Sequence, residues 1–596
     1  MATEITMPQL GLTMEEGTID EWVKHEGDEV KKGDVLCKIT TDKLSNDIEA
    51  EEDGVLLKIV AQEGDDVPVK GVIAYVGKAG EKVPDAAASA PAPAAAAPAP
   101  KAPAAPAPKA AAPAPAPKAT AAKAVDPNQS IAIIGGGPGG YTCAIRLAQL
   151  GAKKVTVIEK SKMGGTCVNI GCIPTKVLVH SGDVAASFKS MDDIGVVGEF
   201  KGVNWDKVQA KREYIVNRMS SGVDSLMKAN KVKVIKGTAE FADKKTLKVT
   251  TNDGKTENMK FDQIIIATGS KNSTPPIPGI DIPEVIGSTE ALSLPKQPKS
   301  MIIVGGGVIG LEFATAYGEM GTKITVLEAL PRLLPPMDGE LTKSLEGVLK
   351  QQGVDIHLEC KVTKFESTKN GAKVTVDHNG KTESYEAEKV LVAIGRRTNT
   401  DGLKLEKAGI ENDRGRITVN DRQETNVPGI WAIGDCVGKT MLAHTAMAMG
   451  EVCAENLMGG DSHYKGVEPS AVYCNPEFAG VGMTEEQVKE KGIPYHVGKF
   501  PLTANAKALI ENGGIGTIKF IVDDKYGEIL GCHILGARAS DLISEPAIAM
   551  DMEGTIDDII ATTHAHPTIY EAIRDAACVT EDRPMNFPPS KKKNKK

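Results

Sequence analysis

The sequence of 596 residues predicts an α/β protein with parallel sheets, preceded by a smaller all-β domain. Residues 127–590 alternate short β-branched runs, such as SIAIIG and KITVLE, with helix-period stretches such as YTCAIRLAQLG. A unit of strand, glycine-rich turn, helix and second strand occurs twice in that region. From about Glu468, alternating segments next to helical ones predict a separate α+β domain. Residues 1–83 hold an internal repeat of strand-like segments, which predicts the all-β part.

The internal repeat joins GTIDEWVKHEG at 17–27 to GVLLKIVAQEG at 54–64. We expect two similar β halves packed face to face, with Lys43 in the turn between them. Nine lysines against nineteen acids give residues 1–83 a net charge of −10. Residues 84–126 are Ala, Pro and spaced Lys, a composition typical of an extended linker with a reach on the order of 100 Å.

Composition excludes several classes of protein. Lys and Arg number 70 against 79 Asp and Glu, a net charge of −9 that disfavours nucleic-acid binding. No apolar run approaches the roughly 18 residues of a membrane span. The first residues lack the features of a signal or transit peptide, so we expect the mature chain to start there. Ten cysteines are too sparse for a disulfide scaffold and predict a cytoplasmic protein with mostly reduced thiols.

Each glycine-rich unit carries the residues of a Rossmann-like dinucleotide site. Glycines permit a tight turn and close approach to a pyrophosphate at the helix N-terminus, and an acid ending the second strand accepts a hydrogen bond from the adenosine ribose. In the second unit this acid also favours NAD over NADP, although the nearby Arg332 is a counter-signal. The predicted residues are Gly135, Gly137, Gly140 and Glu159 in the first unit, and Gly305, Gly307, Gly310 and Glu328 in the second.

Between the two units, GGTCVNIGCIPTK holds Cys167 and Cys172 five residues apart. On an ideal helix their Cα atoms would lie about 7.5 Å apart along the axis, farther than a disulfide tolerates. A disulfide therefore needs an irregular entry to the helix, which the glycines of this segment make feasible. A helix N-terminus and Lys176 would favour a reactive thiolate. Two buried reduced cysteines are the alternative, and no second Cys or His pair supports a metal site.

Near the C-terminus, HAHPTIYE places His566 before Pro567, a residue suited to a first helical position. Glu571 would then lie early in that helix and could reach back to the imidazole, fixing its tautomer and raising its basicity. Taken alone, a histidine before a helix is more often a cap or a surface residue. His564 has no such partner in the sequence, and we interpret it as structural.

These motifs together resemble the pyridine nucleotide-disulfide oxidoreductases over residues 127–585. GGTCVNIGCIPTK resembles the redox helix of that family, and HAHPTIYE resembles its base motif. The resemblance implies a homodimer that uses FAD and NAD to oxidise protein-bound dihydrolipoyl groups through a Cys167–Cys172 disulfide, with His566 and Glu571 completing the cysteine site of the partner subunit. Cys167 would exchange with the lipoyl group, and Cys172 would face the flavin.

The resemblance assigns further residues to the flavin. Lys176 and Glu312 resemble an ion pair beside the flavin ring, and Asp435 in WAIGDC resembles the residue that holds the ribityl chain. Glu312 could otherwise be a surface acid of a helix.

Residues 1–80 resemble a lipoyl domain, with Lys43 of TDK as the lipoylated residue. Biotinyl domains share that fold, but they usually flank their lysine with Met, whereas Asp42 precedes Lys43 here. The expected organisation is a lipoyl domain at 1–83, the linker at 84–126, an FAD-binding domain at 127–272, an NAD-binding domain at 273–394, a central domain completing the FAD site at 395–467, a dimerisation domain at 468–590 and a basic tail at 591–596.

Two other functions compete with this one. A different NAD(P)H-dependent disulfide reductase would leave the lipoyl domain unexplained, and Glu328 favours NAD. A non-catalytic lipoyl carrier or assembly subunit would have no need of Cys167, Cys172 and His566. The sequence does not distinguish between a 2-oxo acid, acetoin or glycine dehydrogenase complex as the setting.

Overall fold

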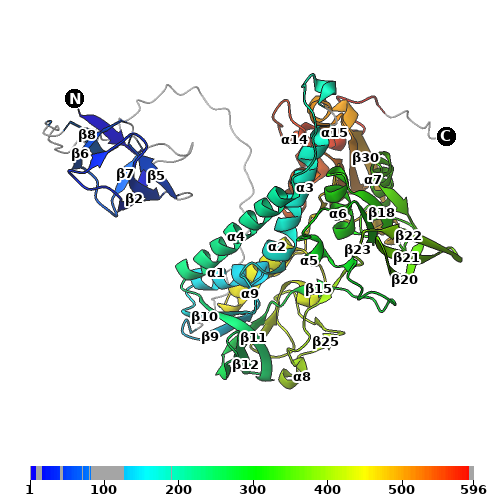
Figure 1. The fold of residues 1–596 in the computed structure, drawn as a ribbon, viewed down its shortest axis with the longest axis horizontal. Helices are drawn as coiled ribbons and strands as arrows, with labels where there is room; N and C mark the ends of the chain where they lie inside the picture. Colours follow the sequence, from blue (N-terminus) through cyan, green and yellow to red (C-terminus); the bar gives the residue numbers. More distant parts are fainter. Residues whose placement is uncertain are drawn as a thin grey trace, which may run out of the picture. The chain divides into compact units, whose positions relative to one another are not determined.

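The computed structural model describes residues 2–7, 16–40, 45–50, 52–69, 71–78, 81, 126–188 and 191–589. The chain forms two compact units, residues 1–116 and 117–596, which are drawn in Figure 1. Lys43, and almost all of the linker and the basic tail, lie outside the described residues. Within the described ranges, no helix is long and apolar enough to cross a membrane.

The N-terminal unit consists of two four-stranded sheets that share one apolar core. The first sheet has the order β1 (Thr3–Thr6), β8 (Val72–Gly77), β6 (Gly54–Ile59) and β3 (Glu29–Val30), and the second β5 (Ser45–Glu49), β4 (Val35–Thr40), β2 (Glu16–Trp22) and β7 (Asp66–Pro68).

Backbone hydrogen bonds exchanged between the two halves confirm the internal repeat. The turn after β2 binds the strand of the other half, because Gly27 N donates to Leu56 O at 2.8 Å and Leu56 N donates to Asp28 O at 3.0 Å. The turn after β6 repeats the pattern, since Gly64 N donates to Ile19 O at 2.7 Å. Gly27 and Gly64 both have positive φ, which glycine adopts without strain.

The second unit begins with a seven-stranded sheet, ordered β13-β12-β11-β10-β9-β14-β27. Its strands from β11 to β27 are parallel, whereas β12 and β13 extend the sheet in antiparallel fashion. Residues 395–467 contribute β27 and part of the same core. The strands are β9 (Ser130–Ile134), β10 (Lys154–Glu159), β11 (Lys233–Asp243), β12 (Thr246–Thr251), β13 (Thr256–Lys260), β14 (Gln263–Ile266) and β27 (Ile430–Ala432).

The second sheet of this unit has five parallel strands in the order β16-β23-β17-β18-β19. An antiparallel sheet of three strands is inserted between β19 and β23 in the sequence and packs in the same apolar cluster. These strands are β16 (Val285–Ile286), β17 (Ser300–Val304), β18 (Lys323–Leu327), β19 (Asp355–His357), β23 (Lys389–Val392), and then β20 (Cys360–Thr368), β21 (Gly371–His378) and β22 (Lys381–Ala387).

Helices connect the parallel strands, as the α/β pattern predicts. The first part holds α1 (Pro138–Gln149), α2 (Gly165–Ile170), α3 (Cys172–Ser187), α4 (Trp205–Ala229) and α9 (Ala443–Leu457); the second holds α5 (Ser288–Ala291), α6 (Val308–Glu319) and α7 (Gly339–Gln351). Two short pairs complete these parts, β15 (Ser270–Asn272) with β24 (Arg396–Thr398) and β25 (Asn412–Asp413) with β26 (Arg416–Ile417), together with α8 (Leu405–Ala408).

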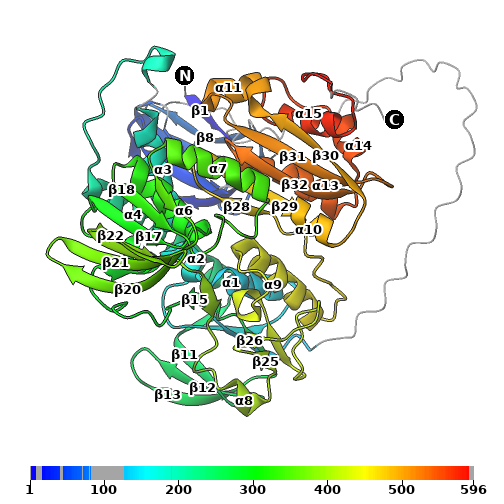
Figure 2. The same cartoon turned by 90° about the vertical axis from the view of Figure 1, so that its right-hand side faces the viewer.

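The last part is a five-stranded antiparallel sheet with short helices, which confirms the expected α+β domain. Figure 2 shows its orange and red elements beside the green second sheet, with the cyan first sheet below. The sheet order is β28 (Ser470–Val472), β29 (Glu477–Gly482), β32 (Ile529–Gly536), β31 (Gly516–Asp523) and β30 (Tyr495–Pro501), and the helices are α10 (Glu485–Glu490), α11 (Ala506–Asn512), α12 (Ala539–Leu542), α13 (Ser544–Asp551), α14 (Ile556–Ala561) and α15 (Glu571–Thr580).

Candidate active site and dinucleotide sites

The first glycine-rich turn joins β9 to α1 and leaves no room for side chains at two of its positions. Gly135 has φ +112°, and a Cβ there would lie 2.2 Å from the carbonyl oxygen of Ala267. A Cβ on Gly140 would lie 2.0 Å from the carbonyl oxygen of Gly135. Gly137 is the N-cap of α1, so the positive end of the helix dipole is directed at the space above the turn.

Glu159, the last residue of β10, is held by the turn itself. One carboxylate oxygen accepts a hydrogen bond from Gly136 N at 2.7 Å, and the other accepts one from Ser161 N at 2.7 Å. The residue is only 8% exposed. Each carboxylate oxygen keeps a further lone pair, so the oriented group can still accept a hydrogen bond from a ribose hydroxyl.

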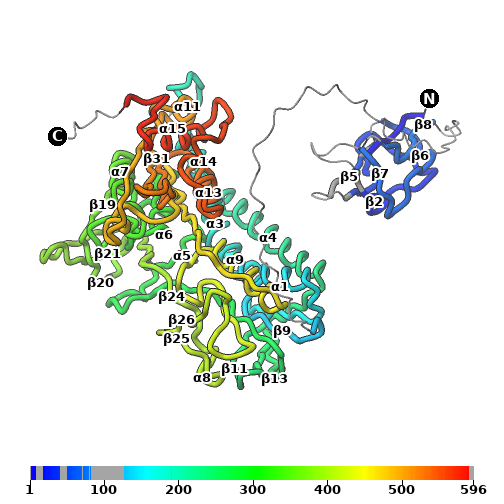
Figure 3. Tube along the Cα trace, turned by 180° about the vertical axis from the view of Figure 1, so that it is seen from behind, coloured from blue at the N-terminus to red at the C-terminus, as the bar shows by residue number. Residues whose placement is uncertain are grey.

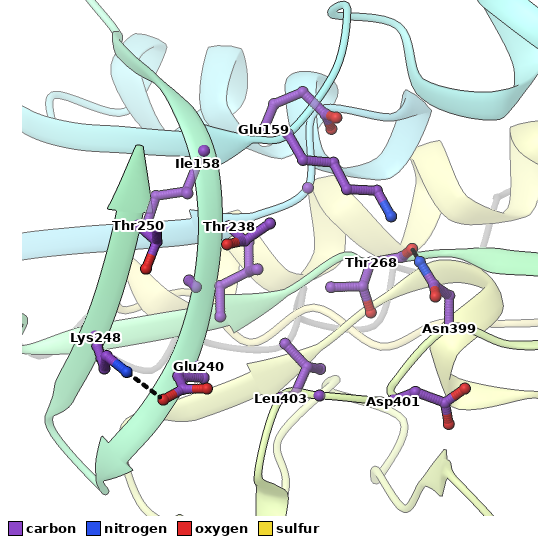
Figure 4. Close-up of a pocket in the computed structure, with 16 residues that line it drawn as sticks. Ile158, Glu159, Thr238, Glu240, Lys248, Thr250, Thr268, Asn399, Asp401 and Leu403 are labelled. Carbon is purple, nitrogen blue, oxygen red and sulfur yellow. Dashed lines mark hydrogen bonds and ion pairs between the residues drawn. The ribbon is translucent and has the colours of Figure 1, made fainter. Parts of the chain in front are cut away.

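A cavity of about 320 Å³ opens beside Glu159, between the end of β10, the strands β11 and β12 and the loop at 399–403. Figure 4 shows Thr238, Thr268 and Asn399 around the same space. The hydroxyl of Thr268 is buried and has no hydrogen-bond partner among the described residues. A buried polar atom of this kind is normally satisfied, so the cavity fits the polar adenosine end of a bound dinucleotide.

Sequence reasoning did not find the residues of this cavity other than Gly135 and Glu159. The signal that could have found Thr268 is its position after β14, in the run IIIATG, because polar residues after parallel strands line such sites. Thr238 and Thr250 reach the cavity only because β11 pairs with β10 and β12 with β11.

The second glycine-rich turn repeats the main features of the first. Gly305 also has φ +112°, and a Cβ on Gly310 would lie 2.0 Å from the carbonyl oxygen of Gly305. Glu328 accepts hydrogen bonds from Gly306 N at 2.6 Å and from Leu330 N at 2.8 Å. Gly307 is the N-cap of α6. The predicted dinucleotide residues of both units therefore come together in the same arrangement.

The two predicted redox cysteines flank a break between two helices. Cys167 lies on α2, Cys172 begins α3, and Gly171 between them has φ −150° and ψ −114°. This break supplies the irregular helix entry that a bond between the two cysteines requires. Both cysteines are free thiols in this structure; Cys172 is exposed and Cys167 partly so, which argues against the alternative of two buried structural cysteines.

The two thiols have different affinities for a proton. A hydrogen bond with Cys167 is the largest influence and lowers the pKa of Cys172 to about 7, against the opposing effect of desolvation; the charge of Lys176 adds a smaller lowering. The same hydrogen bond, together with burial, raises the pKa of Cys167. The reduced pair therefore loses its first proton to give a thiolate at Cys172 stabilised by the Cys167 thiol.

Lys176 and Glu312 form an ion pair that ties α3 to α6. The ammonium lies 2.7 Å and 2.8 Å from the two carboxylate oxygens and 4.1 Å from the ring centre of Tyr473. Glu312 is 4% exposed and also accepts a hydrogen bond from Tyr473 N. It is therefore a buried paired acid, and the alternative of a surface helix acid is wrong.

Asp435 lies in a short 3₁₀ turn directly after β27, at the end of the same sheet that carries the first glycine-rich turn. Its carboxylate accepts a hydrogen bond from the hydroxyl of Ser270. Arg396, which sequence reasoning missed, donates to that hydroxyl at 2.7 Å and interacts electrostatically with both Asp435 and Cys172.

The backbone of the cysteine segment is attached directly to the first turn. Gly164 N donates to Gly136 O at 2.8 Å. A Cβ on Gly165 would lie only 2.6 Å from the Cα of Gly137. The first dinucleotide turn, the cysteine pair, the Lys176–Glu312 pair and the Asp435 turn consequently form one continuous site.

His566 and Glu571 form the predicted dyad. The imidazole Nδ1 lies 2.9 Å from one oxygen of Glu571, whose other oxygen accepts a hydrogen bond from Thr568 N at 2.9 Å. Although desolvation acts to raise the pKa of Glu571, these hydrogen bonds hold it below the ordinary value. The His566 side chain is 78% exposed, so its other ring nitrogen is accessible from outside the subunit.

Two details of the C-terminal motif differ from expectation. Pro567 does not begin the helix, because α15 starts at Glu571. Just before and at that start, the backbone hydrogen bonds span three residues, as in a 3₁₀ turn: Ala572 N donates to Ile569 O, and Ile573 N donates to Tyr570 O. His564 does have a carboxylate partner, since its Nε2 lies 2.7 Å from Glu545 of α13. Its side chain is 6% exposed, in keeping with a structural role.

Two helices of the predicted site, α15 and α2, lie apart within one subunit. In Figures 1 and 2, α15 lies apart from α2. Seen from behind, α15, α14 and α11 occupy one end of the unit, and α1 and β9 the other (Figure 3). Within one chain, the helix that begins with Glu571 therefore does not lie beside the helix that carries Cys167.

Two dinucleotide turns, one of them joined to a low-pKa dithiol, define a flavin- and nicotinamide-dependent disulfide oxidoreductase. The model of the pyridine nucleotide-disulphide oxidoreductases matches residues 129–450, and that of their dimerisation domain matches residues 468–577. The chain belongs to this family. A model described as biotin-requiring enzyme matches residues 3–76.

Named relatives span most of the chain. A mitochondrial dihydrolipoyl dehydrogenase of Pisum sativum is 41% identical over 78% of this chain and 94% of its own length. A dihydrolipoyl dehydrogenase of Bacillus subtilis is 40% identical over 76% of this chain and 97% of its own. Among solved structures, LpdA from Mycobacterium tuberculosis superposes with a TM-score of 0.71 at 27% identity, covering 75% of this chain and 99% of LpdA. The flavoprotein disulfide reductase RclA from Escherichia coli gives 0.68 at 31% identity, over 76% of this chain and 99% of RclA.

Proposed function

We propose that this protein is a flavoenzyme that oxidises protein-bound dihydrolipoyl groups with NAD as acceptor, as a cytoplasmic component of a 2-oxo acid, acetoin or glycine dehydrogenase complex. The observation that carries the proposal is the cysteine pair beside the first dinucleotide turn, with the pKa of Cys172 lowered to about 7. The names of the relatives and the match at residues 3–76 support the dihydrolipoyl substrate.

The thiol chemistry follows from the cysteines and the dyad. His566, oriented by Glu571, accepts a proton from one thiol of the dihydrolipoyl group. The resulting thiolate attacks Cys167 in the Cys167–Cys172 disulfide, which breaks the bond between the cysteines and releases Cys172 as a thiolate. The second thiol then displaces Cys167, so the lipoyl group leaves as a disulfide and both cysteines are reduced.

FAD, held at the first turn, would supply two-electron exchange with the dithiol, and NAD, held at the second, would supply the hydride acceptor. The chain itself orients them: Glu159 and Glu328 would meet the two adenosine riboses, and Asp435 the ribityl chain. Lys176 stabilises the Cys172 thiolate, while Glu312 neutralises and positions Lys176.

We further propose that the active site is formed between the subunits of a homodimer, because His566 is exposed and the helix after it, α15, lies apart from α2, which carries Cys167. Mixed dimers test this. Chains carrying Cys172→Ser, which retain His566, are paired with chains carrying His566→Ala, which retain Cys172. Each parent is inactive, but the mixed dimer regains one intact site of two if His566 acts across the interface. No recovery in isolated mixed dimers contradicts the proposal.

Lys43 is proposed as the lipoylated residue of the N-terminal domain. The linker at 84–126 would present this lipoyl group to the cysteine site at an effective concentration on the order of millimolar. Intact mass of the wild type should exceed its sequence mass by one lipoyl group, and Lys43→Arg should remove the addition. The same variant should leave oxidation of free dihydrolipoamide unchanged. An unmodified wild type from cells able to lipoylate would contradict this role.

Substrate assays separate the competing functions. The purified protein should reduce NAD with dihydrolipoamide and show little reaction between glutathione disulfide and NADPH. Preference for glutathione disulfide would indicate a different disulfide reductase. A protein without a flavin absorption spectrum would instead support the carrier or assembly role.

A further inference from the structure

The loop between Glu328 and Asp338 folds back over the second glycine-rich turn. Leu334 N donates a hydrogen bond to Gly306 O at 3.0 Å. A methyl carbon of Leu333 lies 2.4 Å from where a Cβ on Gly306 would be. Arg332 precedes Leu333 in the chain and is therefore beside the turn. It lies four residues beyond Glu328, the acid that would meet the ribose, and is the one basic residue in residues 329–337.

The guanidinium of Arg332 is held by other groups. Its Nη2 donates to Pro335 O at 2.5 Å, and its Nη1 lies 3.4 Å from Glu486 of α10. It also occupies the space beside Gly339, where a Cβ would lie 2.3 Å from Nη1 and 2.4 Å from a carboxylate oxygen of Glu486. The absence of a side chain at Gly339 thus leaves a recess that the ion pair fills.

Glu486 stays in position without help from Arg332. Its carboxylate accepts a hydrogen bond at 3.1 Å from Gly339 N, the first residue of α7, where the helix dipole favours an anion. Lys519 of β31 bridges the two helices, since it lies 2.7 Å from Glu485 of α10 and 2.9 Å from Asp338, the N-cap of α7. Lys519 and Asp338 are at most 1% exposed.

We infer that Glu486 is a specificity-determining residue for the nicotinamide cofactor, because it holds Arg332 away from the ribose end of the second turn. An arginine near this acid is the group that accommodates the 2′-phosphate of NADP. Glu328 disfavours that phosphate by repulsion, and Glu486 removes the nearby cation that would bind it. This rests on the proposed binding of NAD at the second turn.

The test compares three variants of the full-length protein. Glu486→Gln removes the charge that attracts Arg332, and Gly339→Ala fills the recess. Glu490→Gln, an exposed residue on the same helix, is the matched control. The readouts are the calorimetric Kd of adenosine 2′,5′-bisphosphate relative to adenosine 5′-monophosphate, and the ratio of kcat/KM for NADP to that for NAD.

Both ratios should shift about two- to fivefold toward the 2′-phosphate ligand in Glu486→Gln and in Gly339→Ala, the size expected for a partly exposed ion pair. Glu490→Gln should leave them unchanged, and adding Arg332→Ala should cancel the shift. Unchanged ratios in folded Glu486→Gln and Gly339→Ala overturn the inference, as does an equal shift in the Arg332→Ala background. A wild type that fails to reduce NAD at all would instead contradict the proposed function.

Discussion

The first and second glycine-rich turns share their backbone geometry and differ in what covers them. Gly135 and Gly305 have the same φ, and Glu159 and Glu328 accept the same hydrogen bond from the second glycine of each turn. Above the first turn, however, Gly165 at the start of α2 comes close to Gly137. A Cβ on Gly307 of the second turn would meet nothing within 4 Å.

This difference matches the two proposed ligands. A turn whose N-cap glycine lies against the cysteine segment is suited to a resident flavin, because the redox cysteines are then fixed beside that turn. In the second turn, Leu333 and Leu334 lie against Gly306, but the N-cap Gly307 is uncovered. An uncovered N-cap is suited to NAD, which must enter and leave in each catalytic cycle. The glycine-rich turn specifies dinucleotide binding, and the residues packed around the turn determine which dinucleotide remains bound.

The largest expected effect comes from removing one redox cysteine beside the first turn while leaving both dinucleotide turns intact. Cys172→Ser should reduce dihydrolipoamide-dependent NAD reduction at least about a thousandfold, because no cysteine disulfide can form. Electron transfer from NADH to an artificial acceptor through the flavin should persist, since both turns remain intact. Full lipoamide activity in Cys172→Ser would refute the assignment of the cysteine pair.

Matched alanine substitutions at the two helix N-caps test the comparison directly. Gly137 and Gly307 have negative φ, and a Cβ at either is free of steric conflict, so both variants should fold. The added methyl group lies where the pyrophosphate approaches. Gly137→Ala should lower the flavin content of the purified protein.

Gly307→Ala should keep full flavin content and raise the Kd for NAD about tenfold, which corresponds to about 1.4 kcal/mol. Flavin content and NAD affinity are measured on the same preparations by absorbance and calorimetry. Loss of flavin from Gly307→Ala, or loss of NAD binding alone from Gly137→Ala, would reverse the assignment of the two turns.

A smaller effect is expected from the charge beside the cysteines. Lys176→Met should raise the apparent pKa of the reduced pair above about 7, because the ammonium favours the Cys172 thiolate. At pH 7 the variant should therefore contain less thiolate, and its thiolate absorbance should appear only at higher pH. The Kd for NAD should stay unchanged. In the control Lys207→Met, both the apparent pKa of the reduced pair and the Kd for NAD should stay unchanged. An unchanged apparent pKa of the reduced pair in Lys176→Met would contradict the role of Lys176 in stabilising the Cys172 thiolate.

The sequence predicts best those features that backbone geometry determines locally. Gly140 and Gly310 are fixed because a Cβ at either position would meet a carbonyl oxygen at 2.0 Å. The break at Gly171 follows from the same kind of constraint. These positions have one acceptable residue, so their spacing in the sequence is informative.

Features that depend on tertiary pairing could not be predicted. Thr238 reaches the adenosine cavity through the pairing of β11 with β10, and Glu545 meets His564 from another helix. Arg332 was visible in the sequence, but its direction depends on Glu486, which is 154 residues away. The start of α15 was placed too early, because Pro567 fits both a helix start and the preceding turn.

An anaerobic titration of the full-length protein with dihydrolipoamide, followed by NAD, tests the central claim most directly. The account predicts a flavin spectrum that gains a long-wavelength thiolate-to-flavin band on reduction, and that returns to the oxidised form when NAD is added. Both changes should be absent in Cys172→Ser. A protein without flavin, or a flavin that dihydrolipoamide reduces equally well in Cys172→Ser, would contradict the account.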